Sequence, residues 1–170
     1  MTNRRSLLLA LPALAALPAV AQAQEDLPTD VVDAFHLALQ NNDTAKALAL
    51  LSRELVVFEF GLVDPSIEAY AFAHLPFDMD YKKQTTWEQT SRRMGGTGDI
   101  RWVLTTFRIR GNQPDGTVID EIHLETMILQ RVAEAWRIAH IHWSSVPADV
   151  DTLQGNRPMP GVVSPGMQQP

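Results

Sequence analysis

Cysteine is absent from the 170 residues of this chain. Disulfide bonds, thiolate metal ligands and cysteine nucleophiles are therefore excluded, and stability outside the cytoplasm must come from packing of the core alone. Basic residues are scarce, with 14 Lys and Arg against 20 Asp and Glu, and they form no cluster. This balance argues against nucleic acid or an anionic membrane surface as a partner. The sequence also lacks a glycine-rich phosphate loop and a Gly-x-Ser-x-Gly nucleophile elbow.

The first 23 residues have the composition of an export signal. Arg4-Arg5 precede an apolar run over residues 7–20, and Ala21-Gln22-Ala23 has the small-x-small pattern of a cleavage site. The run is too short, and too interrupted by proline, to span a membrane. We therefore expect a periplasmic or secreted protein with no membrane insertion after cleavage. The order of residues 3–8 is similar to that of a twin-arginine signal.

Residues 24–147 are expected to form one domain, because this length suits a single sizeable core. Residues 148–170 are rich in Pro, Gly and Gln and predict a disordered tail. Three helices are predicted in the first half of the domain. Thr29 would cap the first, Asp43 the second, and Asp64-Pro65 would begin a third that ends at Leu75-Pro76.

Strands are predicted by β-branched and aromatic runs, mostly in the second half of the domain. The expected strands cover residues 55–60, 82–93, 100–110, 117–131 and 136–146. Helices followed by a run of antiparallel strands predict an α+β fold. A strongly bent sheet wrapped over the helices would leave a hollow lined by polar groups.

The last two predicted strands form a hairpin that carries three of the five histidines. A pairing of Arg131 with Trp136 fixes the other facing residues, because side chains alternate along a strand. The predicted pairs are Met127 with His140, Glu125 with His142, and His123 with Ser144. This register would place the imidazoles and one carboxylate on the face that also carries Trp136, whereas a slip of one residue would separate them.

Several strings of residues resemble the NTF2-like superfamily, and within it the exported SnoaL-like or DUF4440-type proteins. The matching strings are Leu55-Val56-Val57-Phe58-Glu59, Tyr70 through Pro76 with Asp78, Glu125 through Leu129, and Trp136-Arg137-Ile138-Ala139-His140-Ile141-His142-Trp143-Ser144-Ser145. The resemblance implies a cone-shaped barrel of α+β class, with N-terminal helices packed in a strongly curved antiparallel sheet. It also implies a pocket at the wide end and commonly a homodimer through the sheet. It does not imply one activity, since relatives include isomerases, polyketide cyclases and dehydratases.

These observations lead to a first hypothesis of an exported pocket protein that binds a small organic ligand without a cofactor. The residues expected to contact the ligand are Glu59, His74, His123, Trp136 and Ser144. A second hypothesis is a cofactor-independent lyase or isomerase. In it, His142, oriented by Glu125, would remove a proton next to a carbonyl, and His140 or His74 would donate to the oxyanion.

Two further alternatives use the same hairpin. Its histidines and Glu125 could ligate a divalent metal, which would require three or four ligands that converge on one point. The exposed face of the sheet could instead serve a purely structural or assembly role.

Overall fold

The computed structural model describes residues 27–149, so the predicted export signal and most of the predicted tail lie outside the described residues. The elements, in chain order, are α1 (Pro28–Gln40), α2 (Thr44–Ala49), β1 (Leu51–Glu59), β2 (Leu62–Asp64), α3 (Ile67–Phe72), α4 (Leu75–Gln84), β3 (Thr85–Thr97), β4 (Ile100–Asn112), β5 (Val118–Val132) and β6 (Ala135–Pro147). The predicted α+β class is confirmed. Within this part of the chain, no helix is long and apolar enough to cross a membrane.

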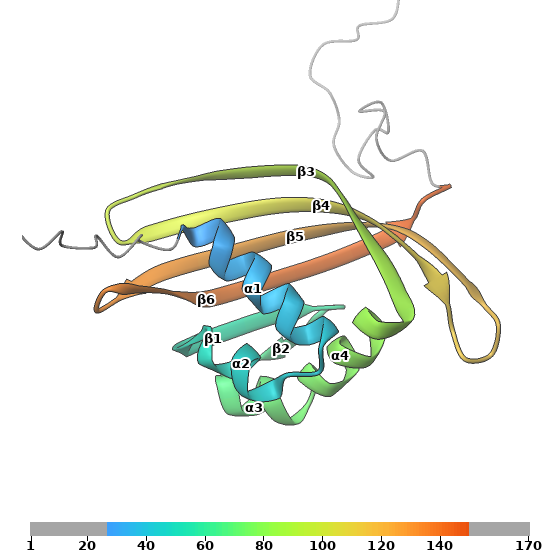
Figure 1. The fold of residues 1–170 in the computed structure, drawn as a ribbon, viewed down its shortest axis with the longest axis horizontal. Helices are drawn as coiled ribbons and strands as arrows, with labels where there is room; N and C mark the ends of the chain where they lie inside the picture. The colour runs from blue at the N-terminus through green and yellow to red at the C-terminus, as the bar shows by residue number, and fades with distance from the viewer. Residues whose placement is uncertain (1–26, 150–170) are drawn as a thin grey trace, which may run out of the picture.

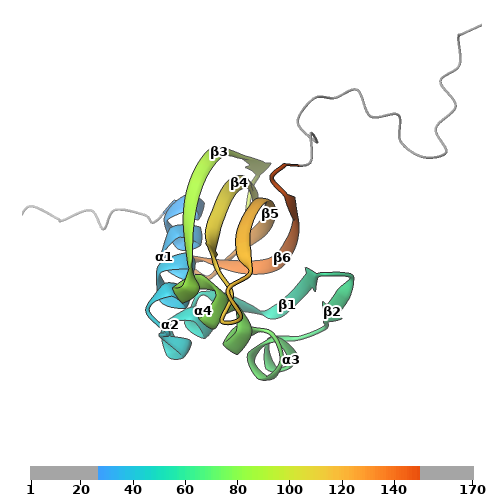
Figure 2. The ribbon, with the colours of Figure 1, turned by 90° about the vertical axis from the view of Figure 1, so that its right-hand side faces the viewer.

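The strands form one sheet in the order β2-β1-β6-β5-β4-β3. It is strongly curved but does not close, and α1 lies in its concave side (Figures 1 and 2). The pairs are antiparallel except for β1 and β6, which run parallel. This parallel pair departs from the wholly antiparallel sheet predicted from the sequence. It brings the inner face of β1 beside the C-terminal half of β6.

The main core lies between α1 and the concave face of the sheet. Its fully buried members include Phe35, Leu55, Tyr70, Met127, Leu129, Ile138 and Ile141. Each such side chain stabilises the fold by about 1.5–3 kcal/mol relative to an exposed one. A second cluster of Phe107, Ile109 and Ile119 lies beside Tyr81 and Trp87.

The helix starts follow the predicted chemistry only in part. Helix α1 begins at Pro28, before the predicted Thr29 cap, because proline fits the first helical position and the Asp30 carboxylate accepts the Leu27 N–H at 3.1 Å. Asp43 does cap α2, where it accepts the N–H of Lys46 at 2.9 Å.

The segment between β2 and β3 corrects two predictions. Asp64 ends β2 instead of capping a helix, and Ser66 caps α3 by accepting the Ala69 N–H at 3.2 Å. Leu75-Pro76 does not end a helix but begins α4, because proline is tolerated in a first turn. Residue 82, predicted to begin a strand, therefore lies on a helix.

A β-bulge in β6 corrects the predicted register of the hairpin. Arg131 pairs with Trp136 as predicted, and the regular ladder continues to Leu129 and Ile138. Ala139 is then an extra residue, so the next pair joins Ile128 to His140. The pairs predicted for His140, His142 and Ser144 are therefore wrong: Thr126 faces His142, Leu124 faces Ser144, and Glu125 faces Trp143.

The bulge also decides which side chains face inward. Ile141 and Trp143 are buried, whereas His142 and Ser144 are exposed and His140 is half-buried. Partner strand β1 is irregular between Leu51 and Val56, and the backbone oxygen of Val56 lies 2.9 Å from Nδ1 of His140. The His140 ring is thus held at the strand backbone, on the outer side of the sheet.

Candidate functional site

A cavity of about 520 Å³ opens between β1, α4 and the adjoining ends of β5 and β6. We call it the mouth pocket. Its lining includes the acidic residues Glu59, Asp78, Asp80 and Glu121, the aromatic residues Phe60, Phe77, Tyr81, Trp87 and Trp143, and also Ile119, His123 and Ser145. The lining drawn from residues 27–149 contains no Lys or Arg. The mouth pocket is therefore acidic and aromatic, which favours a neutral or cationic ligand with a flat apolar body.

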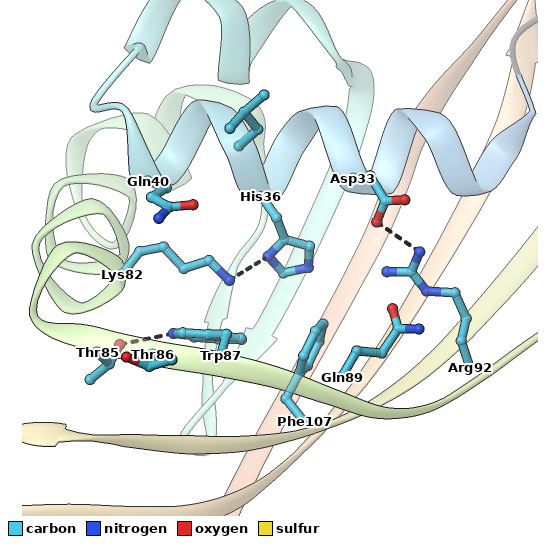
Figure 3. Close-up of a pocket in the computed structure, with 11 residues that line it drawn as sticks. Asp33, His36, Gln40, Lys82, Thr85, Thr86, Trp87, Gln89, Arg92 and Phe107 are labelled. Carbon is cyan, nitrogen blue, oxygen red and sulfur yellow. Dashed lines mark hydrogen bonds and ion pairs between the residues drawn. The ribbon is translucent and has the colours of Figure 1, made fainter.

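A second cavity, of about 410 Å³, lies between α1, α4, β3 and β4 (Figure 3). We call it the side pocket. Its lining is more polar and includes Asp33, His36, Gln40, Lys82, Gln89 and Arg92. Trp87 borders both cavities.

A buried polar cluster lies beneath the two pockets. Glu125 on β5 is only 2 % exposed, and its Oε2 lies 2.7 Å from Nε2 of His36 on α1. Trp143 donates its indole N–H to the same oxygen at 2.8 Å. On the other side of the imidazole, Nζ of Lys82 lies 3.1 Å from Nδ1 of His36. One carboxylate is thus linked through one imidazole to one amine.

Charge and burial shift the pKa values in this cluster in opposite directions. Burial alone would raise the pKa of Glu125, but the His36 charge and the hydrogen-bond donors of His36 and Trp143 outweigh it and lower the pKa to about 2. Burial lowers the pKa of Lys82 to about 7, although Glu125 opposes this shift. Glu125 is therefore ionised at neutral pH, whereas the Lys82 amine is close to its titration midpoint.

His123 lies above this cluster and in the lining of the mouth pocket. Its ring packs against Trp87 and Trp143, with centroids 4.9 and 6.2 Å away. Burial lowers the pKa of His123 to about 4, against the attraction of Glu125. Its Nε2 is buried and has no hydrogen-bond partner among residues 27–149. A neutral imidazole with a free ring nitrogen therefore borders the pocket.

Two carboxyl groups of the mouth pocket have raised pKa values. Glu59 faces inward from β1 and is 7 % exposed, and its Oε2 has no hydrogen-bond partner in the described part of the chain. Burial, with repulsion from Asp78 and Asp64, raises the pKa of Glu59 to about 8. Burial also raises the pKa of Asp78 to about 7, although hydrogen bonding to Tyr70 and the charge of His74 oppose the shift.

Two contacts hold Asp78 and Asp64, the two acidic residues whose charges act on Glu59. Tyr70 donates its hydroxyl hydrogen to Oδ2 of Asp78 at 2.6 Å. Nδ1 of His74 lies 2.5 Å from Oδ2 of Asp64. His74 on the loop before α4 is therefore paired with Asp64 at the end of β2.

The structure separates the residues predicted to act together. Glu59 and His123 line the mouth pocket, and Glu125 lies beneath it. His140, His142 and Ser144 lie on the outer face, so the predicted contact between His142 and Glu125 is absent. Trp136 is buried in the core, and its ring packs against the guanidinium groups of Arg101 and Arg131.

The predicted metal ligands of the hairpin do not converge on one point, because they lie on opposite faces of the sheet. His123 and Glu125 face inward, whereas the histidines at 140 and 142 lie on the outer face. Within residues 27–149, no group of three or more His, Asp or Glu side chains could hold a metal ion.

Sequence reasoning missed two members of the buried cluster. The sequence predicts Lys82 at the start of a strand, whereas helix α4 turns its amine inward. The spacing of Val32, Phe35, His36 and Leu39 along the first helix predicts only a packing role for His36. Its position one turn after Val32 does indicate an inward side chain, but no local pattern identifies a partner that lies 89 residues away on β5.

Comparison with known proteins agrees with this architecture. The family model of the SnoaL-like domain matches residues 29–149. A candidate ketosteroid isomerase from Shewanella frigidimarina is 33 % identical, with a TM-score of 0.64, over 68 % of this chain and 92 % of that one. No curated protein matches the sequence.

More distant structures share the fold alone. A candidate dehydratase of the NTF2-like family from Streptomyces avermitilis is 17 % identical, with a TM-score of 0.59, over 68 % of this chain and 91 % of that one. The association domain of C. elegans CaMKII is 18 % identical, with a TM-score of 0.57 and the same two coverages. The predicted NTF2-like resemblance is confirmed, and the chain belongs to the SnoaL-like domain family.

Proposed function

We propose that the mouth pocket binds a small, uncharged organic carbonyl compound and catalyses proton transfer on it, as a cofactor-independent isomerase or lyase. The observation that carries this proposal is the Glu59 carboxyl group, which is buried in the pocket lining with an oxygen that has no partner among residues 27–149. A buried polar atom without a partner is costly, and a ligand that hydrogen-bonds to it removes that cost.

The raised pKa values suit two different roles. Asp78 has a pKa of about 7, so its carboxylate is available at neutral pH and is basic enough to remove a proton next to a carbonyl. Glu59, with a pKa of about 8, is mainly protonated at neutral pH and can donate a hydrogen bond to the developing oxyanion. His123 offers a second donor if its proton is on Nε2. These roles replace the predicted pair of His142 and Glu125.

The pocket wall supports the choice of ligand. Trp87, Trp143 and Ile119 provide an apolar surface, and the acidic rim disfavours an anion. The relative from Shewanella frigidimarina is named as a candidate ketosteroid isomerase, and isomerisation of such a ketone is also a proton transfer.

Turnover of a β,γ-unsaturated ketosteroid, followed by the ultraviolet absorbance of its conjugated product, tests the proposal. We expect Glu59→Gln and Asp78→Asn each to lower kcat by about 10²–10⁴-fold while the melting temperature does not fall. Asp80→Asn is the matched control, since Asp80 is an exposed acid of the same helix and the same pocket. Equal losses in all three variants would indicate a general electrostatic effect and would refute the specific roles.

Ligand binding without turnover is the second candidate, favoured by the aromatic walls and the neutral imidazole of His123. In that case the ketosteroid would raise the melting temperature as its concentration exceeds Kd, without product formation. His123→Ala would then abolish the thermal shift. Absence of both turnover and thermal shift would exclude steroid-like ketones as ligands.

A homodimer through the outer face of the sheet is proposed as the assembly. Leu104, Thr126, His142 and Phe58 form one row across four strands, and Leu104 and Phe58 are 38 % and 41 % exposed. Exposed apolar side chains that lie on one face of a sheet are typical of an interface. The double variant Leu104→Glu/Phe58→Glu should halve the mass measured by light scattering, whereas a monomeric wild type would refute the dimer.

Export to the periplasm, with cleavage after Ala23, is also proposed from the sequence pattern. Amino-terminal sequencing of the protein from a periplasmic fraction tests it. Replacement of Arg4-Arg5 by Lys-Lys should block export by the twin-arginine route but not by the general secretory route.

A further inference from the structure

The side pocket contains a buried primary amine at its inner wall. Lys82 is only 7 % exposed and extends from α4 toward the His36 ring, above the indole of Trp87 (Figure 3). Its Nζ lies 3.1 Å from Nδ1 of His36 and 3.4 Å from the centroid of the Trp87 ring. The amine is therefore fixed at two points and borders an open cavity of about 410 Å³.

The neighbours of the amine determine its protonation. Nε2 of His36 faces the ionised Glu125, so one hydrogen of the ring lies on that side. The negative charge of Glu125 opposes the loss of the Lys82 proton. Once Lys82 loses its third proton, its nitrogen has a free lone pair, and Nδ1 of His36 lies 3.1 Å away as a proton acceptor. Burial favours this neutral amine, since it lowers the pKa of Lys82 to about 7.

We propose that Lys82 is a nucleophile that captures small polar aldehydes or ketones in the side pocket as an imine. The cavity, the fixed amine and the adjacent imidazole together carry the inference. It does not depend on the function proposed for the mouth pocket, whose carboxyl groups are absent from the lining of the side pocket. The polar ends of Gln40 and Gln89 favour a carbonyl compound with hydroxyl substituents.

The reaction consumes one amine and one carbonyl compound and releases one water. The Lys82 lone pair attacks the carbonyl carbon, and the electrons of the C=O double bond move to oxygen. His36 Nδ1 first carries one proton from the attacking nitrogen to the alkoxide oxygen, which becomes a hydroxyl group. It then carries the second nitrogen proton to that hydroxyl group. That hydroxyl leaves as water while the carbon–nitrogen double bond forms. The nearby Glu125 carboxylate stabilises the imidazolium during the transfer.

Reductive trapping of the full-length protein with glycolaldehyde and sodium cyanoborohydride at pH 7 tests this inference. The chain has three lysines, at positions 46, 82 and 83, and the other two are exposed and serve as internal controls. Peptide mapping by mass spectrometry should show Lys82 modified at least tenfold faster than Lys83. Modification of Lys82 in the folded wild type at or below the rate of Lys83 would overturn the proposal.

Variants separate the nucleophile from the proton carrier. Lys82→Arg should abolish the fast modification, whereas Lys83→Arg should leave it unchanged. His36→Gln, which cannot carry the proton, should slow modification of Lys82 at least tenfold without changing that of Lys83. Fast modification that persists in His36→Gln would overturn the role given to His36. Glu59→Gln should have no effect, so failure at the mouth pocket and failure at the side pocket are distinguishable.

Discussion

His36 on α1 holds its Nε2 2.7 Å from Oε2 of Glu125 on β5, and so ties the first helix to the centre of the sheet. Both side chains are buried, and the indole of Trp143 and the amine of Lys82 extend the contact on either side. Such a cluster is stable only as a whole, because each member compensates the burial of another.

Removal of the carboxylate should therefore destabilise the protein strongly. We expect Glu125→Ala to lower the free energy of unfolding by about 3–5 kcal/mol, since the remaining donors stay buried without their acceptor. Urea denaturation measures the loss. Asp33→Asn is the control, because Asp33 lies on α1 like His36 but takes part in an exposed ion pair. The Asp33 carboxylate is 60 % exposed in its contact with Arg92 and should contribute only about 0–1 kcal/mol. A loss in Glu125→Ala no larger than in the control would contradict the cluster.

The buried carboxyl group of Glu59 predicts that the stability of the protein decreases as pH rises. Its pKa is about 8 in the folded protein and near the ordinary 4.5 when unfolded, so the unfolded chain releases this proton first as pH rises. Stability from the protonated group is full below pH 4.5 and is lost between 4.5 and 8. Glu59→Gln should therefore match the wild type at pH 4 and exceed it at pH 8, by about 4 kcal/mol.

Denaturation of wild type and Glu59→Gln across this range measures the difference. Glu121→Gln is a suitable control, because Glu121 borders the same pocket but is half-buried and accepts a hydrogen bond from Tyr81. A constant difference between Glu59→Gln and the wild type at every pH would show that the pKa of Glu59 is the same in the folded and unfolded protein, and would contradict its shift.

His123 predicts a loss of stability in acid. Its pKa falls from the ordinary 6.5 to about 4 in the folded protein, so the unfolded chain binds this proton first as pH decreases. Stability is therefore full above pH 6.5 and falls between 6.5 and 4. His123→Gln should flatten the melting temperature over that interval. Carbon-detected NMR of the imidazole provides a direct check, since a midpoint near 6.5 would contradict its desolvation.

The sequence predicts the direction of a side chain only where the strand keeps the regular two-residue alternation. The pairing of Arg131 with Trp136 followed from the local pattern of the hairpin. Ala139 is an extra residue that interrupts the alternation in β6. The neighbouring strand β1, more than 80 residues earlier in the chain, is also irregular in its pairing with β6, between Leu51 and Val56. A bulge fixed by a distant strand has no signature in the hairpin itself.

The candidate site was predictable to a similar degree. Glu59 was identifiable as a lone acid in an apolar strand, although only the parallel pairing with β6 places it beside Trp143. Lys82 was assigned to the wrong element, because proline at Leu75-Pro76 was interpreted as a helix end and not as a helix start. The chemistry therefore lies at positions where tertiary packing overrides the local pattern.

His142 gives the sharpest test of the observed register. It lies on the outer face and is exposed, and its ring lies 6.1 Å from that of Phe58, between centroids. His142→Ala should therefore leave ketosteroid binding and turnover in the mouth pocket unchanged within about twofold, because it touches neither pocket. His123→Ala, one strand away but on the inner face, should abolish the ligand-induced thermal shift measured in parallel. Loss of that shift in His142→Ala at an unchanged melting temperature would restore the unbulged pairing with Glu125 and refute the outward orientation of the histidine.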